Sequence, residues 1–409
     1  MALTTTVEIS RQSLQESAVP QATITRVNHL ASYSWIEAPI PTISVPGIPP
    51  RWSPPGRSRQ LPKDSGLIYI AQNAARHPDS PLEPLFRALY TANPSFDISP
   101  IDVVTDRNNI RKLLSFVDPS TSQNGLDPFV INVEVTKNTV IFCRTETAAT
   151  DFIGPHKFRG FGHEFEKAYT TCEISDSTGH HRIVSYRFGG LRFIVRHEVD
   201  GYVDSRRGSS SSSKGPGTES LSSLLGSLSL SNAKSTPKGT TPAGSKMVIR
   251  QEGRKVPLRS TLEIKTRAAH KPLDISGVAP QLWASQTPML VRAYHKDGTF
   301  TAPKVEDVTA EIKEWEQEKQ VSLKKLASLM KKILSVVREY GGSAVIKYDI
   351  TIDRLVVKKV EGKQMLPKEL YSKWDNKHKS EATSAGYRDV KPGHRGGAVE
   401  INADEAEQD

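Results

Sequence analysis

Hydrophobic and polar residues alternate with a period of two along several segments of the chain, a pattern that predicts β-strands. PFVINVEV (128–135) and NTVIFCR (138–144) are two such runs, and a turn at Lys137-Asn138 joins them into a hairpin. RIVSYRF and LRFIVRHEVD flank Gly189-Gly190, where the two glycines permit the positive φ angles of a two-residue hairpin. Further strands are predicted at LIYIA (67–71), KMVIRQ (246–251), STLEIKTR (260–267) and a last hairpin over 343–361.

Hydrophobic positions spaced by three and four residues predict helices elsewhere. The proline-rich segment Thr25–Pro55 is predicted to be extended instead, because proline fixes φ and cannot donate a backbone hydrogen bond. Together these elements predict an α/β (α+β) fold, with a mixed, largely antiparallel twisted sheet flanked by helices. The predicted helices cover 81–92, Arg107–Val117 with Asp106 as N-cap, a part of Phe158–Thr171, and 309–340, which Gly341-Gly342 ends.

Composition divides the 409 residues into a core, an insert and tails. Of the 42 residues in 205–246, 14 are Ser and none is aromatic. Such a segment cannot bury enough apolar surface to offset its ordering entropy, although LSSLLGSLSL (221–230) within it is a candidate transient helix or docking motif. The expected organisation is a disordered tail at 1–20, a core formed by 21–204 and 247–375, a disordered insert at 205–246 and a polar C-terminal tail at 376–409.

The charge balance favours a polyanionic partner. Lys plus Arg is 55 and Asp plus Glu is 45, which gives a formal net charge of +10. Two cysteines are too few for a disulfide framework or a Cys-based zinc site. No stretch approaches the roughly 18 apolar residues of a membrane span, and the N-terminus lacks the apolar run of a secretory signal. We therefore expect a soluble intracellular protein that does not bind a membrane.

The strand LRFIVRHEVD (191–200) carries the first candidates for chemistry. Successive side chains of a strand point to opposite faces, so Arg196, Glu198 and Asp200 share one face. The opposite face is apolar and belongs on a core; it consists of Phe193, Val195 and Val199. The strand is therefore expected to end in two carboxylates that lie roughly 7 Å apart.

The strand TLEIKT (261–266) repeats this arrangement, with Glu263 and Lys265 on one face. If it pairs with the strand that ends at Asp200, the four side chains of Glu198, Asp200, Glu263 and Lys265 converge. Carboxylates that lie so close raise each other's pKa unless a cation neutralises them. Carboxylate oxygens are the ligands that Mg²⁺ and Mn²⁺ prefer, so the sequence predicts a site for one or two such ions.

Metal-assisted phosphodiester hydrolysis uses this set of groups. Acidic ligands hold the ions that activate a water, and a cation such as Lys265 positions that water or offsets developing charge. E-x-D followed by E-x-K on strands is the arrangement of PD-(D/E)XK nucleases. The alternative is structural, because charged side chains also occur on solvated strand edges.

Four motifs occur in order along the chain: GHEFEKAYT (162–170), EVD (198–200), EIK (263–265) and WASQ (283–286). In this order they resemble the eukaryotic decapping exoribonuclease (DXO-like) family. The resemblance implies that Glu166, Glu198, Asp200 and Glu263 bind the metal with the backbone carbonyl of Ile264. It also implies that Lys265 lies beside the attacking water and Gln286 near the scissile phosphate. An upstream arginine would hold the RNA 5′ end, for which Arg144 is the best match and Arg159 a poorer one; Arg196 is a further candidate for substrate binding.

The resulting hypothesis is an Mg²⁺- or Mn²⁺-dependent RNA nuclease that acts at RNA 5′ ends, by decapping or 5′→3′ trimming, in the nucleus or the cytoplasm. Its expected partners are RNA with a 5′ phosphate or cap and, through the insert or the tails, a protein. An alternative is a catalytically weak or inactive member of the fold that binds RNA or protein. A DNA nuclease on the same fold is a third possibility, because 2′-hydroxyl contacts rather than the catalytic motifs separate the two substrates.

Overall fold

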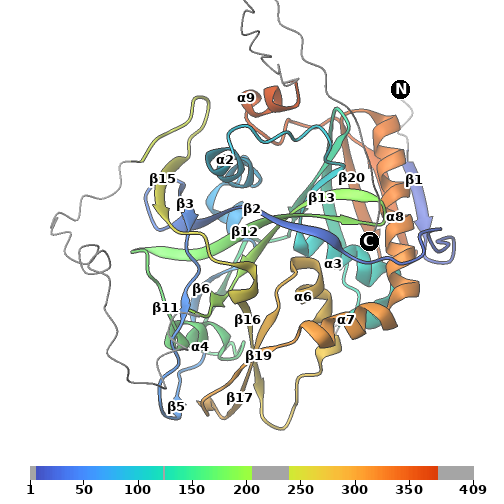
Figure 1. Ribbon diagram of the computed structural model, residues 1–409. Helices are drawn as coiled ribbons and strands as arrows, with labels where there is room; N and C mark the ends of the chain where they lie inside the picture. Colours follow the sequence, from blue (N-terminus) through green and yellow to red (C-terminus); the bar gives the residue numbers. More distant parts are fainter. Residues whose placement is uncertain (1–5, 123–124, 205–238, 376–409) are drawn as a thin grey trace, which may run out of the picture.

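The computed structural model describes residues 6–122, 125–204 and 239–375. Within these residues the strands form an eleven-stranded sheet, a second, smaller sheet and a two-stranded ribbon (Figure 1). Residues 205–238 of the predicted insert and the whole predicted tail 376–409 lie outside the described residues. At the far end of the insert, Thr240 forms an isolated antiparallel bridge with Ile249.

The large sheet is mixed, and most of its neighbouring strands are antiparallel, as the sequence predicts. Its strands lie in the order β1 (Thr6–Ser10), β21 (Arg354–Lys359), β20 (Ser343–Asp349), β8 (Phe129–Thr136), β9 (Thr139–Thr145), β7 (Val103–Asp106), β13 (Leu191–Val199), β12 (Ser177–Phe188), β2 (Thr25–Ile36), β3 (Thr42–Gly47) and β15 (Val248–Gly253). The pairs β13–β7, β7–β9 and β3–β15 are parallel.

The smaller sheet lies next to the end of β13. Its order is β11 (Thr170–Thr171), β4 (Arg51–Trp52), β14 (Gly201–Tyr202), β16 (Thr261–Ala268), β17 (Met289–Lys296), β18 (Thr299–Phe300) and β5 (Arg59–Gln60), and β19 (Val305–Asp307) also pairs with β17. The ribbon consists of β6 (Gly66–Tyr69) and β10 (Thr150–Ile153).

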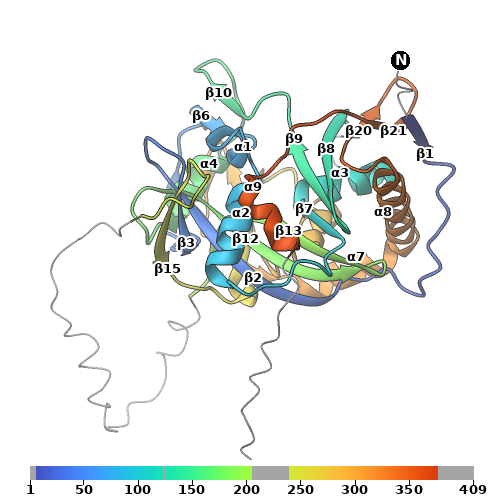
Figure 2. The ribbon, with the colours of Figure 1, turned by 90° about the horizontal axis from the view of Figure 1, so that it is seen from above.

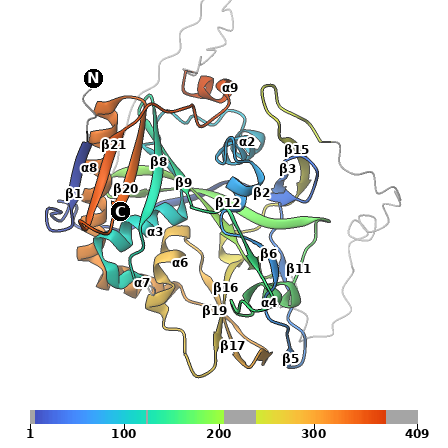
Figure 3. The same cartoon turned by 180° about the vertical axis from the view of Figure 1, so that it is seen from behind.

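Helices cover both faces of the large sheet (Figure 3). One face carries α3 (Arg107–Val117), α6 (Ala279–Ser285), α7 (Thr309–Glu318) and α8 (Gln320–Tyr340). The other carries α2 (Glu83–Ala92) and α9 (Lys368–Tyr371). The other helical elements of the described residues are α1 (Gln72–Arg76), α4 (Gly162–Tyr169) and the 3-10 turns η1 (Pro119–Thr121), η3 (Leu258–Ser260), η4 (Ile275–Gly277) and η5 (Ser372–Trp374).

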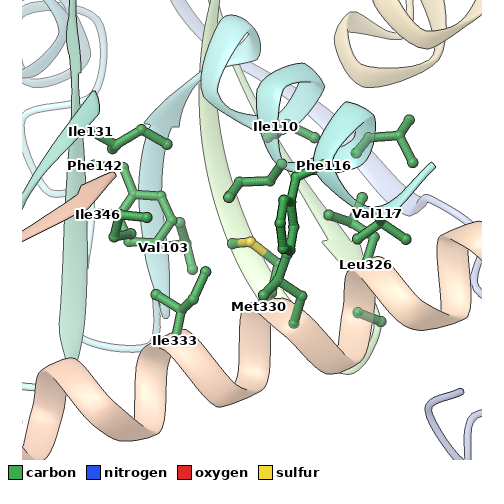
Figure 4. Packing of buried hydrophobic residues seen from close by; sticks show 14 of the residues in the cluster. Val103, Ile110, Phe116, Val117, Ile131, Phe142, Leu326, Met330, Ile333 and Ile346 are labelled. Atoms are coloured by element: carbon green, nitrogen blue, oxygen red, sulfur yellow. The ribbon is translucent and has the colours of Figure 1, made fainter. Parts of the chain in front are cut away.

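Alternation along the central strands builds two hydrophobic cores. In β7, Val103 packs on the side of α3 and α8, whereas its neighbour Val104 packs on the side of α2. Figure 4 shows the first core, where Met330 and Ile333 of α8 face the sheet. A central strand must therefore be apolar on both faces, and the face of β13 that carries Arg196 also buries Ile194. None of the helices in the described residues is long and apolar enough to cross a membrane.

Three sequence predictions need correction. The predicted disordered tail 1–20 contains β1, which is ordered because it pairs along its whole length with β21. The long helix predicted over 309–340 is two helices that meet at Lys319. Asp106 occupies the N-cap position of α3 but makes no side-chain cap, because Arg196 engages its carboxylate.

Candidate active site

The E-x-D and E-x-K motifs meet where the two sheets join. After Asp200 the chain enters β14, where Gly201 lies opposite Leu262 of β16. The backbone N–H of Ile264 donates a 2.8 Å hydrogen bond to Oδ2 of Asp200. The predicted pairing is therefore made by β14 rather than by β13 itself, and it brings Asp200 beside the strand of Glu263.

Glu263 is the most enclosed of the acidic side chains, with only 2% of its surface exposed. Its carboxylate accepts hydrogen bonds from Lys265 Nζ at 2.5 Å, from Arg107 Nη1 at 3.1 Å and from Gln281. Burial alone would raise its pKa, but Lys265 and Arg107 outweigh burial and lower the pKa of Glu263 to about 2. Glu263 is therefore an ionised carboxylate that three donors already hold.

Glu166 reaches the same place from α4. This helix is fixed by its buried aromatic side, where the rings of Phe165 and Tyr169 stack at 4.0 Å between centroids. Burial and the neighbouring carboxylates of Asp200 and Glu198 raise the pKa of Glu166 well above its ordinary value. The described contacts of its carboxylate include no ion pair.

Two further carboxylates complete the group. Burial and the carboxylate of Glu263 raise the pKa of Asp200 to about 8. The side chain of Glu198 is accessible to water but lines a concave surface. Loss of hydration there raises the pKa of Glu198, and the nearby charge of Arg107 reduces this increase. Burial lowers the pKa of Lys265, but Glu263 and Asp200 outweigh it and raise that pKa, so Lys265 is a cation.

The donor chemistry suits a hard divalent cation, because mutually repelling carboxylates of raised pKa are stabilised when an ion replaces their protons. The side chains are not arranged around one ion position, since the described residues contain no group of three or more His, Cys, Asp and Glu that could hold a metal as they stand. Among the described residues Glu166, Glu198 and Asp200 form no ion pair, whereas Glu263 pairs with Lys265 and Arg107. Binding of an ion requires these side chains to rotate toward it.

The structure does not place Gln286 with the acidic residues. Gln286 ends α6 in a left-handed conformation, and its side-chain amide donates to the carbonyl of Trp283 at 2.6 Å. Gln281, at the other end of the same helix, instead donates to Glu263. The WASQ motif therefore lies on the helix that contacts Glu263, but the glutamine that makes this contact is two residues before Trp283, not three residues after it.

Arg196 is engaged in a buried ion pair. Its guanidinium donates to both carboxylate oxygens of Asp106, at 2.6 and 3.0 Å, and further to Tyr33 and to the carbonyl of Pro81. Only 2% of its surface is exposed. Arg196 therefore joins β13 to β7, and although it lines the cavity beside Glu198, Asp106, Tyr33 and Pro81 already accept hydrogen bonds from it; its role in substrate binding stays a prediction.

A cavity of about 210 Å³ opens beside Glu198 and is rich in arginine. Arg107 and Arg111, which are one helical turn apart on α3, line it together with Arg144 of β9. Arg144 donates to Glu146 at 2.7 Å, while Arg111 makes no ion pair in the described residues, and burial lowers its pKa to about 10. Arg159 lies outside the lining and pairs with Asp151. Sequence reasoning found Arg144 but missed the R-x-x-x-R spacing at the start of α3.

This fold is found in solved structures of Rai1. The chain is similar to Schizosaccharomyces pombe Rai1 (14% identity, TM-score 0.52, covering 87% of this chain and 100% of that one). It is also similar to Candida albicans Rai1 in complex with pU5-Mn²⁺ (12%, 0.55, 91% and 99%) and to Scheffersomyces stipitis Rai1 in complex with (3′-NADP)⁺ and calcium (12%, 0.56, 92% and 99%). The DXO-like fold predicted from the motifs is therefore confirmed.

The chain belongs to the family described as "Domain of unknown function (DUF8563)", which matches residues 5–374. No curated protein matches the chain.

Proposed function

We propose that this protein is a divalent-metal-dependent nuclease that acts at the 5′ ends of RNA, by decapping or 5′→3′ trimming, in the nucleus or the cytoplasm. The observation that carries this proposal is the meeting of Glu166, Glu198, Asp200 and Glu263 beside an arginine-lined cavity. Acidic groups that hold a metal and cationic groups that hold phosphate are the two requirements of metal-assisted phosphodiester hydrolysis.

The residues have separate roles in this reaction. Glu166, Glu198, Asp200 and Glu263, with the carbonyl of Ile264, would hold Mg²⁺ or Mn²⁺. A bound ion supplies an activated water and stabilises the leaving oxygen. Lys265 positions the attacking water and offsets negative charge, because its neighbouring carboxylates keep it protonated.

The cavity supports the proposed preference for a 5′ end. Arg111 is partly enclosed and forms no ion pair among the described residues, and a desolvated cation of this kind is stabilised when an anion binds. A terminal phosphate would supply this anion, and Arg107 and Arg144 provide further hydrogen-bond donors around it. The solved C. albicans Rai1, which has a similar fold, is in complex with pU5-Mn²⁺, a ligand of the same chemical class as the proposed substrate.

The test is hydrolysis of 5′-monophosphorylated and capped RNA by the purified full chain with Mn²⁺ or Mg²⁺. We expect metal-dependent product release, and its loss in the double variant Glu198→Ala/Asp200→Ala. Competition between RNA and DNA oligonucleotides of one sequence distinguishes an RNA from a DNA nuclease. Absence of metal-dependent turnover on every RNA in the panel would falsify the proposal.

A second candidate is an RNA-binding module without turnover. The observation that favours it is the state of Glu263, whose two oxygens are occupied by Lys265, Arg107 and Gln281. Calorimetric titration with Mn²⁺ separates the two candidates. A nuclease binds the ion and loses this binding in Asp200→Asn, whereas a scaffold of this kind binds RNA but shows no metal-binding heat.

A further inference from the structure

The ribbon β6–β10 exposes large hydrophobic side chains. Leu67 is 61% exposed and Phe152 is 65% exposed, although most side chains of their size are buried. The two residues lie directly opposite each other in the antiparallel ribbon, so their side chains are neighbours on one face.

The same face leads to the arginine-lined cavity. Tyr69 is two residues beyond Leu67 on β6, so the two side chains share a face at a spacing of about 7 Å. Tyr69 also lines the cavity, and so does the segment Ile70–Ala74 that follows it. Tyr69, Leu67 and Phe152 therefore form a continuous apolar strip, here called the ribbon strip, that starts at the cavity wall.

The ribbon is held in place by its other contacts. The N–H groups of Ile70 and Ala71 both donate to the carbonyl of Ala149, at 2.9 and 3.0 Å, and join the ribbon to α1. On the opposite face Asp151 pairs with Lys157 and Arg159, and at the far end Ile153 is buried. In Figure 2 the ribbon stands at the edge of the molecule beside α1. The strip is thus a fixed surface with its apolar side chains facing water.

Cations accompany the strip. The guanidinium of Arg76 lies 5.0 Å from the ring centroid of Tyr69, and the cavity at the start of the strip contains Arg107, Arg111 and Arg144. Aromatic side chains next to positive charge are how proteins bind single-stranded nucleic acid without reading its sequence, because every base has a face that can stack. Tyr69 and Phe152 supply two such rings, and Leu67 adds apolar contact between them.

We infer that the ribbon strip stacks the first nucleobases of a single-stranded RNA whose 5′ end occupies the cavity. This inference rests on the proposed function and adds the path that the RNA follows beyond its 5′ end. A protein partner fits the strip less well, because three side chains offer at most roughly 150–250 Å² each, below the ~800 Å² per partner of a stable interface. Stacking also makes affinity depend on bases rather than on phosphates alone.

Fluorescence anisotropy in EDTA, with the full chain, tests this dependence. The probes are 5′-phosphorylated octauridylate and an abasic oligomer with the same number of phosphates. We expect the wild type to bind octauridylate at least about fivefold more tightly than the abasic oligomer. Phe152→Ala should lose most of this preference, and Phe152→Trp should retain it. Ile350→Ala is the matched control, because Ile350 is 55% exposed in the turn between β20 and β21.

Two results overturn the inference: equal affinity of the wild type for both oligomers, or unchanged affinity of Phe152→Ala for octauridylate. The second result would indicate that the ribbon strip binds a protein partner instead of RNA. Hydrolysis of the dinucleotide pUpU with Mn²⁺ separates this failure from failure of the proposed function, because hydrolysis depends on the metal site and does not require a preference for bases. If the wild type hydrolyses pUpU with Mn²⁺ but shows no preference for bases, only the inference fails. If it shows the preference but hydrolyses no RNA, only the proposed function fails.

Discussion

Oδ2 of Asp200 accepts a hydrogen bond from the backbone N–H of Ile264 at 2.8 Å, although 64 residues separate the two in the chain. Ile264 lies between Glu263 and Lys265, so this one bond fixes the E-x-D motif against the E-x-K motif. The long insert between the two motifs adds little to the free-energy cost of this contact, because the entropic cost of closing a loop grows only slowly with its length.

Replacement of Glu166 should separate activity from stability. Glu166→Gln removes one member of a repelling carboxylate group, so the free energy of unfolding should stay the same or rise. Metal-dependent RNA hydrolysis should fall at least about 100-fold, because a ligand is lost. Both quantities are measured on the same preparation, by urea unfolding and by product release.

The matched control is Glu164→Gln on the same helix. Glu164 pairs with Lys167 on the surface at 2.7 Å and does not face the carboxylates, so hydrolysis should change less than twofold. Equal losses in Glu164→Gln and Glu166→Gln would show that α4, and not the Glu166 carboxylate, is what activity requires.

Arg111 should contribute to phosphate binding without contributing to stability. Arg111→Met removes a partly enclosed cation that forms no ion pair in the described residues, so unfolding should not become easier. Affinity for 5′-phosphorylated RNA should fall about tenfold or more, since a charge-assisted hydrogen bond is lost. Affinity for the same RNA with a 5′-hydroxyl is the internal control and should change little. A similar loss for both RNAs would contradict a role in 5′-end recognition.

Arg196, in contrast to Arg111, should contribute to stability. Arg196→Met leaves the carboxylate of Asp106 without its bidentate partner beneath the cavity, and breaking such a buried pair costs about 3–5 kcal/mol of stability. The measurement is the urea midpoint of the variant against that of the wild type. The double variant Arg196→Met/Asp106→Leu should recover a large part of the loss, because no unpaired charge remains. A midpoint equal to that of the wild type in Arg196→Met would show that the pair does not hold β13 to β7.

The sequence predicted those features that depend on local chemistry. Gly189 and Gly190 adopt φ angles of +59° and +86°, as the predicted two-residue hairpin requires. Period-two alternation placed Phe193 and Val195 in the core under α3 and α8, and it placed Glu198 and Asp200 at the end of β13. Each of these predictions uses only neighbours along the chain, which is why each could be made from a single sequence.

Partners that are distant in the chain were not predictable in this way. Alternation shows that Arg196 shares a face with Glu198, but only the packing of β7 beside β13 gives Arg196 an acidic partner in Asp106. The same limit applies to Gln281, because the contact of α6 with β16 decides which glutamine reaches Glu263. The roles of the predicted metal ligands and of Lys265 stay predictions, because the positions of side chains alone do not assign a role in the reaction.

The affinity for Mn²⁺ should rise with pH. The pKa of Asp200 is raised to about 8, so below that pH this carboxyl carries a proton that a metal ion must displace. The apparent dissociation constant should therefore fall up to about tenfold per pH unit between pH 6 and 8, and level off above pH 8. Calorimetry in two buffers of different ionisation enthalpy counts the protons released, and the count should approach one or more at pH 6.5. In Asp200→Asn the binding heat and its proton release should be lost together, whereas an affinity of the wild type that is independent of pH would show that the ion does not bind at these carboxylates.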